Sequence, residues 1–405
     1  MKRVVVTGLG MINSVGKDKE TSFSAILDGK CGIKKIELFD IEKFPVKIAG
    51  EITDFNPSEV MDAKEVKKAD RFIQLGMKAA NEAMEDANIS DDMDKERFGI
   101  SSASGIGGLP NIEKNSIICN TRGPRRISPF FIPSSLVNML GGFISIKHNL
   151  KGPNLSSVTA CAAGTHAIVE ATKTIMVGGA DAMLVVGAES AICSAGIGGF
   201  ASMKALSTNN DNPQEASRPF DANRNGFIMG EGAGALVLEE YESAKSRGAR
   251  IYAEIIGFGE SGDAYHITNP IIDGPLRAIR SALKMAGNVK IDYINAHGTS
   301  TPANDKNETE AIKIAFGGKE NCPPVSSIKG QIGHCLGAAG TIEAIVSIMA
   351  IRDGKLPPTI NYTTPDKNCD LDYVPNQSRD AELNVVMSNS FGFGGTNGVV
   401  IFKKI

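Results

Sequence analysis

The sequence has no tryptophan and only five histidines among its 405 residues. Because histidine is the side chain that ordinarily titrates near neutral pH, few groups of this chain can do so. It also has no CxxC pair: the seven cysteines stand singly, and an odd number cannot all be paired within the chain. This usage is typical of reduced thiols in a cytosol and argues against a disulfide framework or a zinc site. We therefore expect a cytoplasmic protein with free thiols.

Long apolar runs and a large excess of charge are missing as well. No segment is apolar for long enough to cross a bilayer, and we expect no signal peptide. The formal net charge of -3 gives no general attraction to nucleic acid or to an anionic membrane, so only local patches of charge can matter. A chain of 405 residues that is 42% hydrophobic can bury a sizeable core or two fused halves, which favours an enzyme over an interaction module.

Short β-branched runs alternate with longer alanine-rich segments of helical spacing, and this pattern predicts an α/β fold with buried sheets. The expected strands include residues 4–7, 182–186, 235–238 and 399–402, and the expected helices include 70–87, 275–286 and 341–351. A polar break at 247–250 follows one helix and precedes a new strand that starts at Ile251. We place the boundary between two halves there, giving 1–250 and 251–405.

Cys161 is the first candidate for a catalytic residue. It lies in TACAAGTHAI, where an apolar run at 153–158 gives way to a small-residue segment with helical spacing from 162 to 177. This pattern predicts a thiol at a helix N-terminus, where the helix dipole lowers a cysteine pKa from about 8.5 and favours the thiolate. Such a cysteine can attack an acyl carbonyl. The alternative is a small core residue, because free cysteine is among the most buried residue types.

Three glycine-rich segments supply further candidates. NAHGTSTPANDKNE places His297 directly after an expected strand at 293–295, and SSIKGQIGHCLGAAG places Lys329 and His334 before a small-residue helix. SNSFGFGGTNG supplies a glycine-rich turn between two strands. A lone histidine is more often a structural residue than a catalyst, and we expect His166, on the helix after Cys161, to be one.

Together these four segments resemble the β-ketoacyl-acyl carrier protein synthases of the thiolase superfamily, in particular the elongating enzymes of bacterial type II fatty acid synthesis. The resemblance runs from VVVTGLGMINSVG near the start to SFGFGGTNGVVIFKKI at the end and includes SRPFDANRNGFIMGEGAG. Its departures are Asn225, where the family usually has an acidic residue, and Ile328, where threonine is common. The resemblance implies a five-layered αβαβα thiolase fold built from two similar halves, and a homodimer.

The resemblance also implies a reaction, the decarboxylative condensation of malonyl-acyl carrier protein with an acyl chain held on Cys161. His297 and His334 would donate hydrogen bonds to the malonyl thioester oxygen. Lys329 would support the second histidine, although an ion pair with an acidic partner such as Glu343 is an equal alternative. Backbone N–H groups of Cys161 and Phe393 would form the oxyanion hole, and the ring of Phe393 would act as a gate over the thiol.

Substrate and partner contacts follow from the same resemblance. It assigns Thr299 and Thr301 to the phosphopantetheine arm, and Ile106, Phe131, Phe200 and Phe391 to the acyl-binding site. It assigns carrier-protein docking to a basic patch of Lys64, Lys67, Lys68, Arg125, Arg126 and Lys204. No organic cofactor and no nucleic-acid or membrane partner is expected. A monovalent cation near Asn295, Glu343, Ser388 and Asn389 remains open.

Other functions fit the sequence less well. VTGLGMINSVG begins like a dinucleotide-binding turn, but Asn13 stands where the third glycine would be. A thiolase would need a second reactive cysteine in the C-terminal glycine loop, which has none; Cys335, next to His334, keeps that alternative open. An initiating synthase would have asparagine in place of His334, and a non-catalytic chain-length partner would lack the Cys161 thiol.

Overall fold

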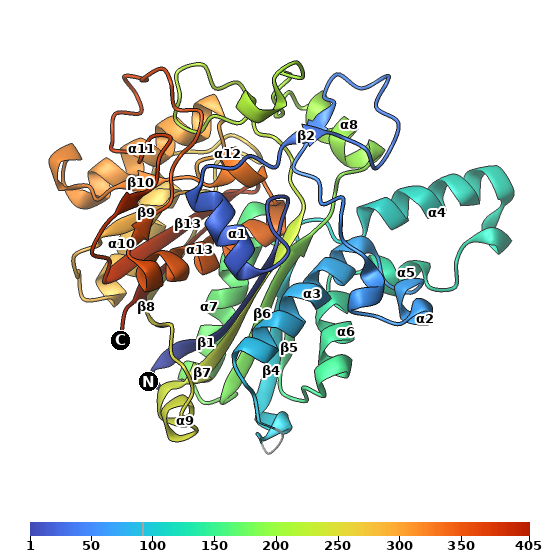
Figure 1. Ribbon diagram of the computed structural model, residues 1–405, viewed down its shortest axis with the longest axis horizontal. Helices are drawn as coiled ribbons and strands as arrows, with labels where there is room; N and C mark the ends of the chain where they lie inside the picture. Colours follow the sequence, from blue (N-terminus) through green and yellow to red (C-terminus); the bar gives the residue numbers. More distant parts are fainter. Residues whose placement is uncertain (91–92) are drawn as a thin grey trace.

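Ten strands form one large mixed sheet in the computed structural model, which describes residues 1–90 and 93–405 (Figure 1). Across the sheet the strands are β10 (Val325–Ser326), β9 (Tyr293–Asn295), β13 (Val385–Gly392), β14 (Thr396–Lys403), β8 (Ala253–Gly262), β1 (Val4–Ile12), β7 (Gly232–Glu240), β6 (Ala182–Glu189), β4 (Phe98–Ala103) and β5 (Asn154–Ser157). The outer pairs, β9 with β10 and β4 with β5, are parallel, whereas β1 is antiparallel to both of its neighbours.

The two halves of the chain contribute five strands each and arrange them in the same order. In each half the third of these strands along the sequence lies at the outer edge, followed by the second, fourth, fifth and first. The two first strands meet at the centre of the sheet, where Val4 lies opposite Ile255 and Val6 lies opposite Ala253. The repeated strand order makes the two halves architecturally similar.

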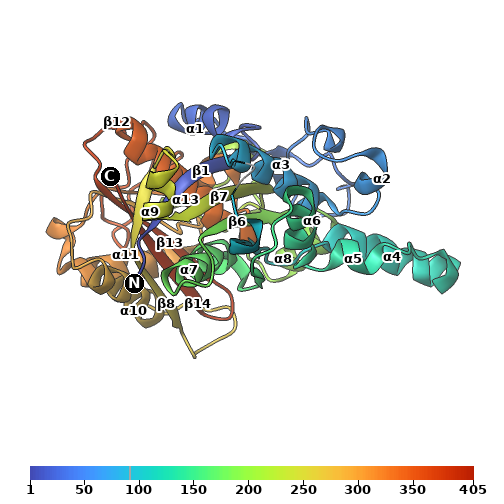
Figure 2. The same ribbon diagram turned by 90° about the horizontal axis from the view of Figure 1, so that it is seen from below.

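Helices lie outside each half of the sheet and also between the halves (Figure 2). α3 (Arg71–Asp86) and α6 (Met139–His148) cover the N-terminal strands, and α10 (Asp273–Met285) and α11 (Pro302–Phe316) cover the C-terminal strands. α7 (Ala163–Met176) and α13 (Ala339–Asp353) form the middle layer, because α13 contacts β7, β13 and α7. The fold therefore has five layers in the order helix, sheet, helix, sheet, helix.

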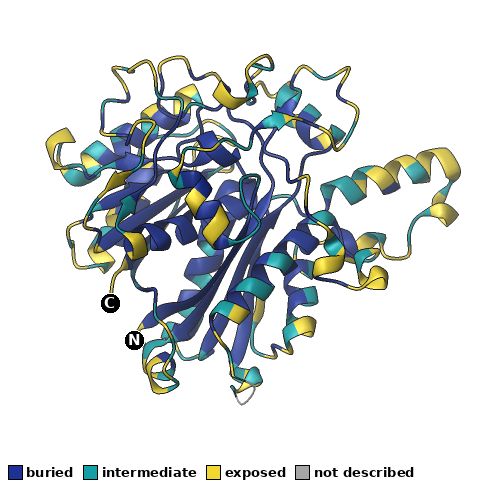
Figure 3. Ribbon diagram, in the orientation of Figure 1, coloured by how far each residue is buried: buried dark blue, intermediate teal, exposed yellow. Residues whose placement is uncertain are grey.

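The middle layer is deeply buried (Figure 3). Every residue of α13 from Ala339 to Ile351 is buried, although most helices of the fold bury one face only. Ala167 and Ile168 of α7 belong to the same hydrophobic cluster as Ile345 of α13. Burial on all sides holds α13 in one position, and α7 packs against it with one side partly exposed, so the segments that precede both N-termini are fixed.

An arm formed by α4 (Leu109–Arg122) and α5 (Phe131–Ser135) projects from this body in both views (Figure 1, Figure 2). The remaining helices are α1 (Lys19–Leu27), α2 (Ala63–Val66), α8 (Ser194–Ser202), α9 (Tyr241–Ser246) and α12 (Lys329–Ile332). Two small sheets pair β2 (Lys34–Lys35) with β3 (Ile48–Ala49) and β11 (Lys355–Leu356) with β12 (Arg379–Asp380).

The strands and helices expected from the sequence are present, with shifts of a few residues at their ends. The strand expected from Ile251 begins at Ala253, because residues 247–250 complete the turn after α9. The apolar run at 153–158 forms the edge strand β5. Within the described ranges, no helix combines the length and apolar character needed to span a membrane.

Candidate active site

Cys161 lies in a 3₁₀ turn, Ala160–Ala162, that leads directly into α7. Ala160 has a φ of 49°, in the left-handed region that non-glycine residues rarely adopt. Such strain costs of order 1–3 kcal/mol and is concentrated at functional sites. Gly392, at the end of β13, lies against this turn: a Cβ there would be 2.9 Å from the carbonyl oxygen of Thr159. The cysteine is therefore held between the start of α7 and the end of β13.

The structure brings Cys161 together with both candidate histidines. The thiol of Cys161 and one ring nitrogen each of His297 and His334 lie within 4.8 Å of one another. The two imidazole rings are 5.4 Å apart and nearly perpendicular, at 81°. All three residues line one cavity of about 330 Å³. Thiol and imidazole are also donors that zinc accepts, so the same trio is a possible ligand set for a soft metal ion.

His334 presents a free N–H to this cavity. Its Nδ1 accepts a hydrogen bond of 3.3 Å from the backbone N–H of Leu336, which places the ring hydrogen on Nε2. Nε2 of His334 is buried and has no partner within the described chain. Burial, followed by the charge of Lys329, lowers the pKa of both His297 and His334 well below 6.5. Both rings are therefore neutral at physiological pH.

Lys329 contacts the first histidine rather than the second. Its ammonium donates to the carbonyl oxygen of His297 at 2.6 Å and also pairs with Glu343. Lys329 acts on His334 through its charge, which adds to burial in lowering the pKa of that ring. The ion pair with Glu343, the alternative drawn from the sequence, is present.

The thiol of Cys161 does not have the lowered pKa expected from its helix terminus. Burial raises its pKa to about 12, although Lys329 and the backbone N–H of Phe393 act in the opposite direction. The expectation of a resting thiolate was therefore wrong. Desolvation outweighs the favourable charges because the side chain is only 8% exposed.

Phe393 lies at the mouth of the site. It is half-buried, and its ring lies 6.4 Å from that of Phe200. The two residues after it, Gly394 and Gly395, have φ values of 84° and 68°, so this turn requires glycine. The N–H of Gly394 donates to the carbonyl of Ile267 at 2.7 Å, which ties the turn to a neighbouring loop.

Most residues assigned to the substrate also line the cavity. The hydroxyl groups of Thr299 and Thr301 lie 2.8 Å apart at its wall, and Phe200, Phe391 and Lys204 line it as well. Ile106 and Phe131 lie outside this cavity. Ile106 packs against the hydrophobic cluster that contains Cys161, whereas Phe131 lies on the projecting arm.

Two buried acids of the site were missed by the sequence analysis. The carboxylate of Glu308 accepts hydrogen bonds of 2.8 Å from the N–H groups of both His297 and Gly298, and burial raises its pKa to about 7. Glu189 accepts from the N–H of Gly337 at 3.0 Å and from the hydroxyl of Ser104 at 2.8 Å. Glu308 thus holds the loop that carries His297, and Glu189 holds the segment that follows His334. Two features of the sequence could have identified these acids. Glu308 lies in the first turns of the helix after the His297 loop, and Glu189 is a charged residue at the end of an apolar strand.

Four oxygen atoms lie buried and unpartnered behind the histidines. They are Oδ1 of Asn295, Oε2 of Glu343, Oγ of Ser388 and Oδ1 of Asn389, and none has a hydrogen-bond partner in the described residues. Buried polar atoms are rarely left unsatisfied in folded proteins. An all-oxygen set with one carboxylate suits a hard cation, so these residues fit the cation that the sequence analysis left open.

The basic residues assigned to docking lie at the surface around the arm. Lys64, Lys67, Arg125, Arg126 and Lys204 are exposed. Lys68 is partly buried, and its ammonium lies 5.4 Å from the centre of the Phe130 ring. That contact links the turn after α2 to the arm, so the two basic segments lie side by side. His166, expected to be structural, forms hydrogen bonds to Thr159 at 2.6 Å and to the carbonyl of Asn397 at 3.2 Å.

Comparison with known protein families gives one result for each part of the chain. The pattern described as "Beta-ketoacyl synthase, N-terminal domain" matches residues 1–244, and "Beta-ketoacyl synthase, C-terminal domain" matches residues 252–363. The chain is 50% identical over 409 residues to 3-oxoacyl-acyl-carrier-protein synthase 2 of Coxiella burnetii, covering 100% of this chain and 99% of the relative. The Staphylococcus aureus (strain N315) enzyme of the same name is 48% identical over 408 residues, covering 100% and 98%.

Solved structures show similarity to the same group of proteins. A beta-ketoacyl synthase from Burkholderia phymatum superposes with a TM-score of 0.93 at 34% identity and covers 100% of both chains. A type II PKS ketosynthase, solved in complex with its acyl-carrier protein, gives a TM-score of 0.91 at 34% identity and covers 100% of this chain and 99% of its own.

Proposed function

The chain belongs to the beta-ketoacyl synthase family, and from that premise we propose that it elongates acyl chains in bacterial type II fatty acid synthesis. It condenses malonyl-acyl carrier protein with an acyl chain carried on Cys161 and releases CO₂ and β-ketoacyl-acyl carrier protein. The observation that carries this conclusion is the convergence of one thiol and two neutral imidazoles within 4.8 Å. Full-length similarity to 3-oxoacyl-acyl-carrier-protein synthases supports it.

The first half-reaction transfers the acyl chain to Cys161. The sulfur attacks the thioester carbonyl of the incoming acyl group, and the tetrahedral oxyanion is held by the N–H groups of Cys161 and Phe393. The bond to the carrier thiol then breaks, and the proton of Cys161 leaves with that thiol. The raised pKa of Cys161 favours a proton transfer that accompanies formation of the S–C bond over one that precedes it.

The second half-reaction uses the two histidines. Neutral His297 and His334 donate hydrogen bonds to the malonyl thioester oxygen, where negative charge develops as the carboxylate leaves as CO₂. The electron pair released from the C–C bond attacks the acyl carbonyl on Cys161, and the cysteine is expelled as a thiolate as the new C–C bond forms. The thiolate then takes a proton from solvent and returns to the thiol. The electrons come from the substrate, so the reaction needs no organic cofactor. Burial, together with the charge of Lys329, keeps both rings neutral, so each ring donates from one nitrogen.

Thr299 and Thr301 bind the phosphopantetheine arm, and Phe200 and Phe391 contact the acyl chain. Their place on the cavity wall beside Cys161 supports this assignment. The carrier protein docks on the basic residues Lys64, Lys67, Lys68, Arg125, Arg126 and Lys204. A related ketosynthase solved with its acyl-carrier protein supports this class of partner. Free cysteines throughout the described chain support a cytoplasmic location.

The functional unit is a homodimer formed through β5 and the arm. β5 is an edge strand of the large sheet, and Leu155 and Val158 on and beside it are 44% and 55% exposed. Apolar side chains also lie exposed along the arm: Ile112, Ile117, Phe130, Ile132 and Leu136. If a second copy covered these surfaces, Phe131 of one copy would lie near the acyl-chain site of the other. Sedimentation should give twice the chain mass, and a monomer with full activity would contradict the assignment.

A monovalent cation bound by Asn295, Glu343, Ser388 and Asn389 would supply positive charge beside the Glu343 carboxylate and satisfy four buried oxygens. The protein should melt at higher temperature in potassium or sodium chloride than in choline chloride of equal ionic strength. Equal melting temperatures in all three salts would exclude the site.

The chain divides into an N-terminal half at 1–250, which carries Cys161, and a C-terminal half at 251–405, which carries both histidines. The repeated strand order and the passage from one family pattern to the next between residues 244 and 252 support this boundary.

Acylation mapping tests the proposed function. After incubation with acyl-acyl carrier protein, peptide mass analysis should place the acyl group on Cys161 alone among the seven cysteines. Cys335 is the informative comparison, because burial also raises its pKa and it lies next to His334. An adduct mainly on Cys335 would contradict the condensing mechanism and favour thiolase chemistry.

A further inference from the structure

We propose that Arg224 is a positioning residue that holds the turn at 299–302 in the shape needed to bind the pantetheine arm. This inference rests on the proposed function, because it concerns the same substrate site. Arg224 does not line the cavity, whereas the turn it contacts carries Thr299 and Thr301 on the cavity wall. Arg224 therefore acts through the turn and not on the substrate.

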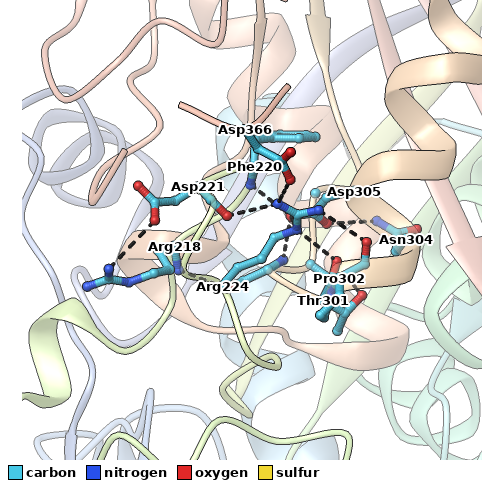
Figure 4. Close-up of polar contacts among 12 residues, drawn as sticks. Arg218, Phe220, Asp221, Arg224, Thr301, Pro302, Asn304, Asp305 and Asp366 are labelled. Atoms are coloured by element: carbon cyan, nitrogen blue, oxygen red, sulfur yellow. Dashed lines mark hydrogen bonds and ion pairs between the residues drawn. The ribbon is translucent and has the colours of Figure 1, made fainter. Parts of the chain in front are cut away.

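The guanidinium of Arg224 is shared among three separate segments of the chain (Figure 4). Nε donates to the carbonyl of Thr301 at 3.2 Å, and Nη2 donates to the carbonyl of Pro302 at 3.1 Å. Nη1 donates to the carbonyl of Asp221 at 2.8 Å and to the carboxylate of Asp366 at 2.7 Å. With a side chain only 5% exposed, these bonds are shielded from water and fix the position of the turn.

Asp305 completes the contact from the far side of the turn. Its Oδ2 lies 3.7 Å from Nε of Arg224 and accepts hydrogen bonds from the N–H groups of Phe220 and Ser300, at 2.8 and 3.2 Å. The carboxylate is fully buried, so it needs both the cation and the N–H donors to offset its loss of hydration. Arg224 therefore holds the turn through its carbonyls, and Asp305 holds it through the N–H of Ser300.

The turn needs this support because its backbone is strained. Ser300 has a φ of 67° without being glycine. Its carbonyl accepts from the N–H of Gly226 at 3.0 Å, and its hydroxyl accepts from the N–H of Arg218 at 2.9 Å. The strained conformation brings the hydroxyls of Thr299 and Thr301 to 2.8 Å from each other on the same wall. Relaxation of Ser300 toward an ordinary conformation would separate the two hydroxyls.

Arginine is suited to this position and lysine is not. A planar guanidinium has five N–H donors in a fixed fork, and four of the acceptors around Arg224 lie within 3.2 Å of it. An ammonium on a flexible stem cannot reach the carbonyls of Thr301 and Pro302 and both remaining acceptors at once. Arg224→Lys therefore keeps the buried charge but releases the turn.

The test measures steady-state kinetics of Arg224→Lys with acyl- and malonyl-pantetheine thioesters. We expect KM for both to rise about tenfold with a smaller change in kcat, since displacement of binding groups by about 1 Å has effects of this size or larger. Alkylation of Cys161 by iodoacetamide, which uses no pantetheine contact, should stay within about twofold of the unchanged protein if the reacting atoms are undisturbed.

A double-mutant cycle decides whether Arg224 acts through the threonines. In a Thr299→Val/Thr301→Val background, Arg224→Lys should add little to KM, because the groups it positions are absent. An Arg224→Lys effect of equal size in both backgrounds would overturn the proposal, as would a parallel loss of pantetheine kinetics and alkylation. If Arg224→Lys does not fold, Asp366→Ala removes one acceptor of the same guanidinium and should raise KM in the same direction; an unchanged KM there would also overturn it.

Arg218→Gln is the matched control. Arg218 belongs to the same polar network, but its side chain pairs with Asp221 and Glu215 and not with the turn carbonyls. KM and alkylation should both stay within about twofold, as for other partly exposed ion pairs of small energetic weight. If the unchanged protein is not acylated by any pantetheine thioester, the proposed function fails; if it is acylated and Arg224→Lys matches it, only this inference fails.

Discussion

The histidines of the site gain their role from what surrounds them. Free imidazole is half protonated near pH 6.5, but burial and Lys329 lower the pKa of His297 and His334 well below that value. A neutral ring donates one hydrogen bond and brings no positive charge into the buried site. This state fits the role proposed for the rings, the stabilisation of an enolate that exists only during the reaction.

Cys161→Gln should separate the two half-reactions. The variant cannot hold an acyl chain, but both histidines remain, so decarboxylation of malonyl-acyl carrier protein should persist. Because the pKa of each folded ring lies well below 6.5, the neutral donors persist as pH falls, and the decarboxylation rate should stay level between pH 8 and pH 6. Release of CO₂ measures it.

The control for that variant is Cys161→Gln combined with His334→Ala, which should abolish decarboxylation. A rate in Cys161→Gln that fell by half between pH 7 and pH 6 would mean that an imidazole titrates near its ordinary pKa, contrary to the burial of both rings. Loss of decarboxylation in folded Cys161→Gln would contradict the division of labour between thiol and histidines.

Phe393→Ala should open the site without unfolding the protein. The ring is half-buried and does not lie in the hydrophobic core, so its removal should change the free energy of unfolding little. Cys161 should become more accessible to iodoacetamide, because the ring no longer covers it. Phe402→Ala provides the contrast: that ring, on β14, is fully buried in the hydrophobic cluster shared with α7 and α13, and its loss should cost about 3–5 kcal/mol. Denaturant unfolding and alkylation rates measure both effects. A destabilisation of Phe393→Ala similar to that of Phe402→Ala, with unchanged alkylation, would make Phe393 a packing residue.

Sequence alone singled out the three residues that the fold brings together at the candidate site, because Cys161, His297 and His334 each stand in a short motif of distinctive composition. It did not give the protonation state of the thiol, since the pKa depends on how deeply the folded chain buries Cys161. The contact of Lys329 with His297 was also missed. That contact depends on the packing of two loops that are far apart along the chain.

At the level of elements, the site depends on the close approach of α7 and α13. A Cβ on Gly340 would lie 2.5 Å from the backbone nitrogen of Thr165, and a Cβ on Gly164 would lie 2.8 Å from that of Thr341. The N-terminal turns of the two helices therefore touch backbone to backbone. Cys161 precedes one helix and His334 precedes the other, so this contact sets the distance between them.

Gly340→Ala should separate the two helices and damage the site. No flexible side chain can yield at this contact, so the substitution should destabilise the fold by about 1–3 kcal/mol and lower kcat. Gly142→Ala on α6 is the matched control, since its Cβ would meet only Met139 at 3.6 Å. There the gain in helix propensity should stabilise by up to about 1 kcal/mol. Equal effects of the two substitutions on unfolding would show that the helix contact is not tight.

The helix contact also shows a limit of sequence analysis. The helical spacing of 162–177 and 341–351 predicted both helices, and each is present. The spacing could not show that they cross at Gly164 and Gly340, because a glycine required by contact with a distant segment has no distinguishing local pattern.

At the scale of the whole molecule, charge is distributed unevenly around a nearly neutral total. The projecting arm and the turn after α2 carry Lys67, Arg125 and Arg126 at the surface. The proposed docking surface for the carrier protein therefore lies on one side of the molecule, away from α10 (Figure 1).

Lys67→Glu/Arg126→Glu should weaken docking. KM for acyl carrier protein should rise about tenfold at low ionic strength and less at high salt, because such attraction is screened over about 8 Å at physiological ionic strength. KM for a short pantetheine thioester should not change. Lys284→Glu/Lys290→Glu, in and beside α10, makes the same change of charge elsewhere and should leave both values unaltered. Equal losses with both substrates in Lys67→Glu/Arg126→Glu would indicate damage to the fold instead.

The repeated strand order has a consequence for symmetry. α7 and α13 occupy equivalent places, each between the third and fourth strands of its half, and their first turns read CAAGT at 161–165 and GAAGT at 337–341. The equivalent of Cys161 is therefore Gly337. A Cβ at Gly337 would lie 2.1 Å from the backbone nitrogen of Gly105, so backbone from the first half fills the space that a second thiol would need. The two-fold architecture is thereby broken at the candidate site, because only the first half has room for a thiol at this position.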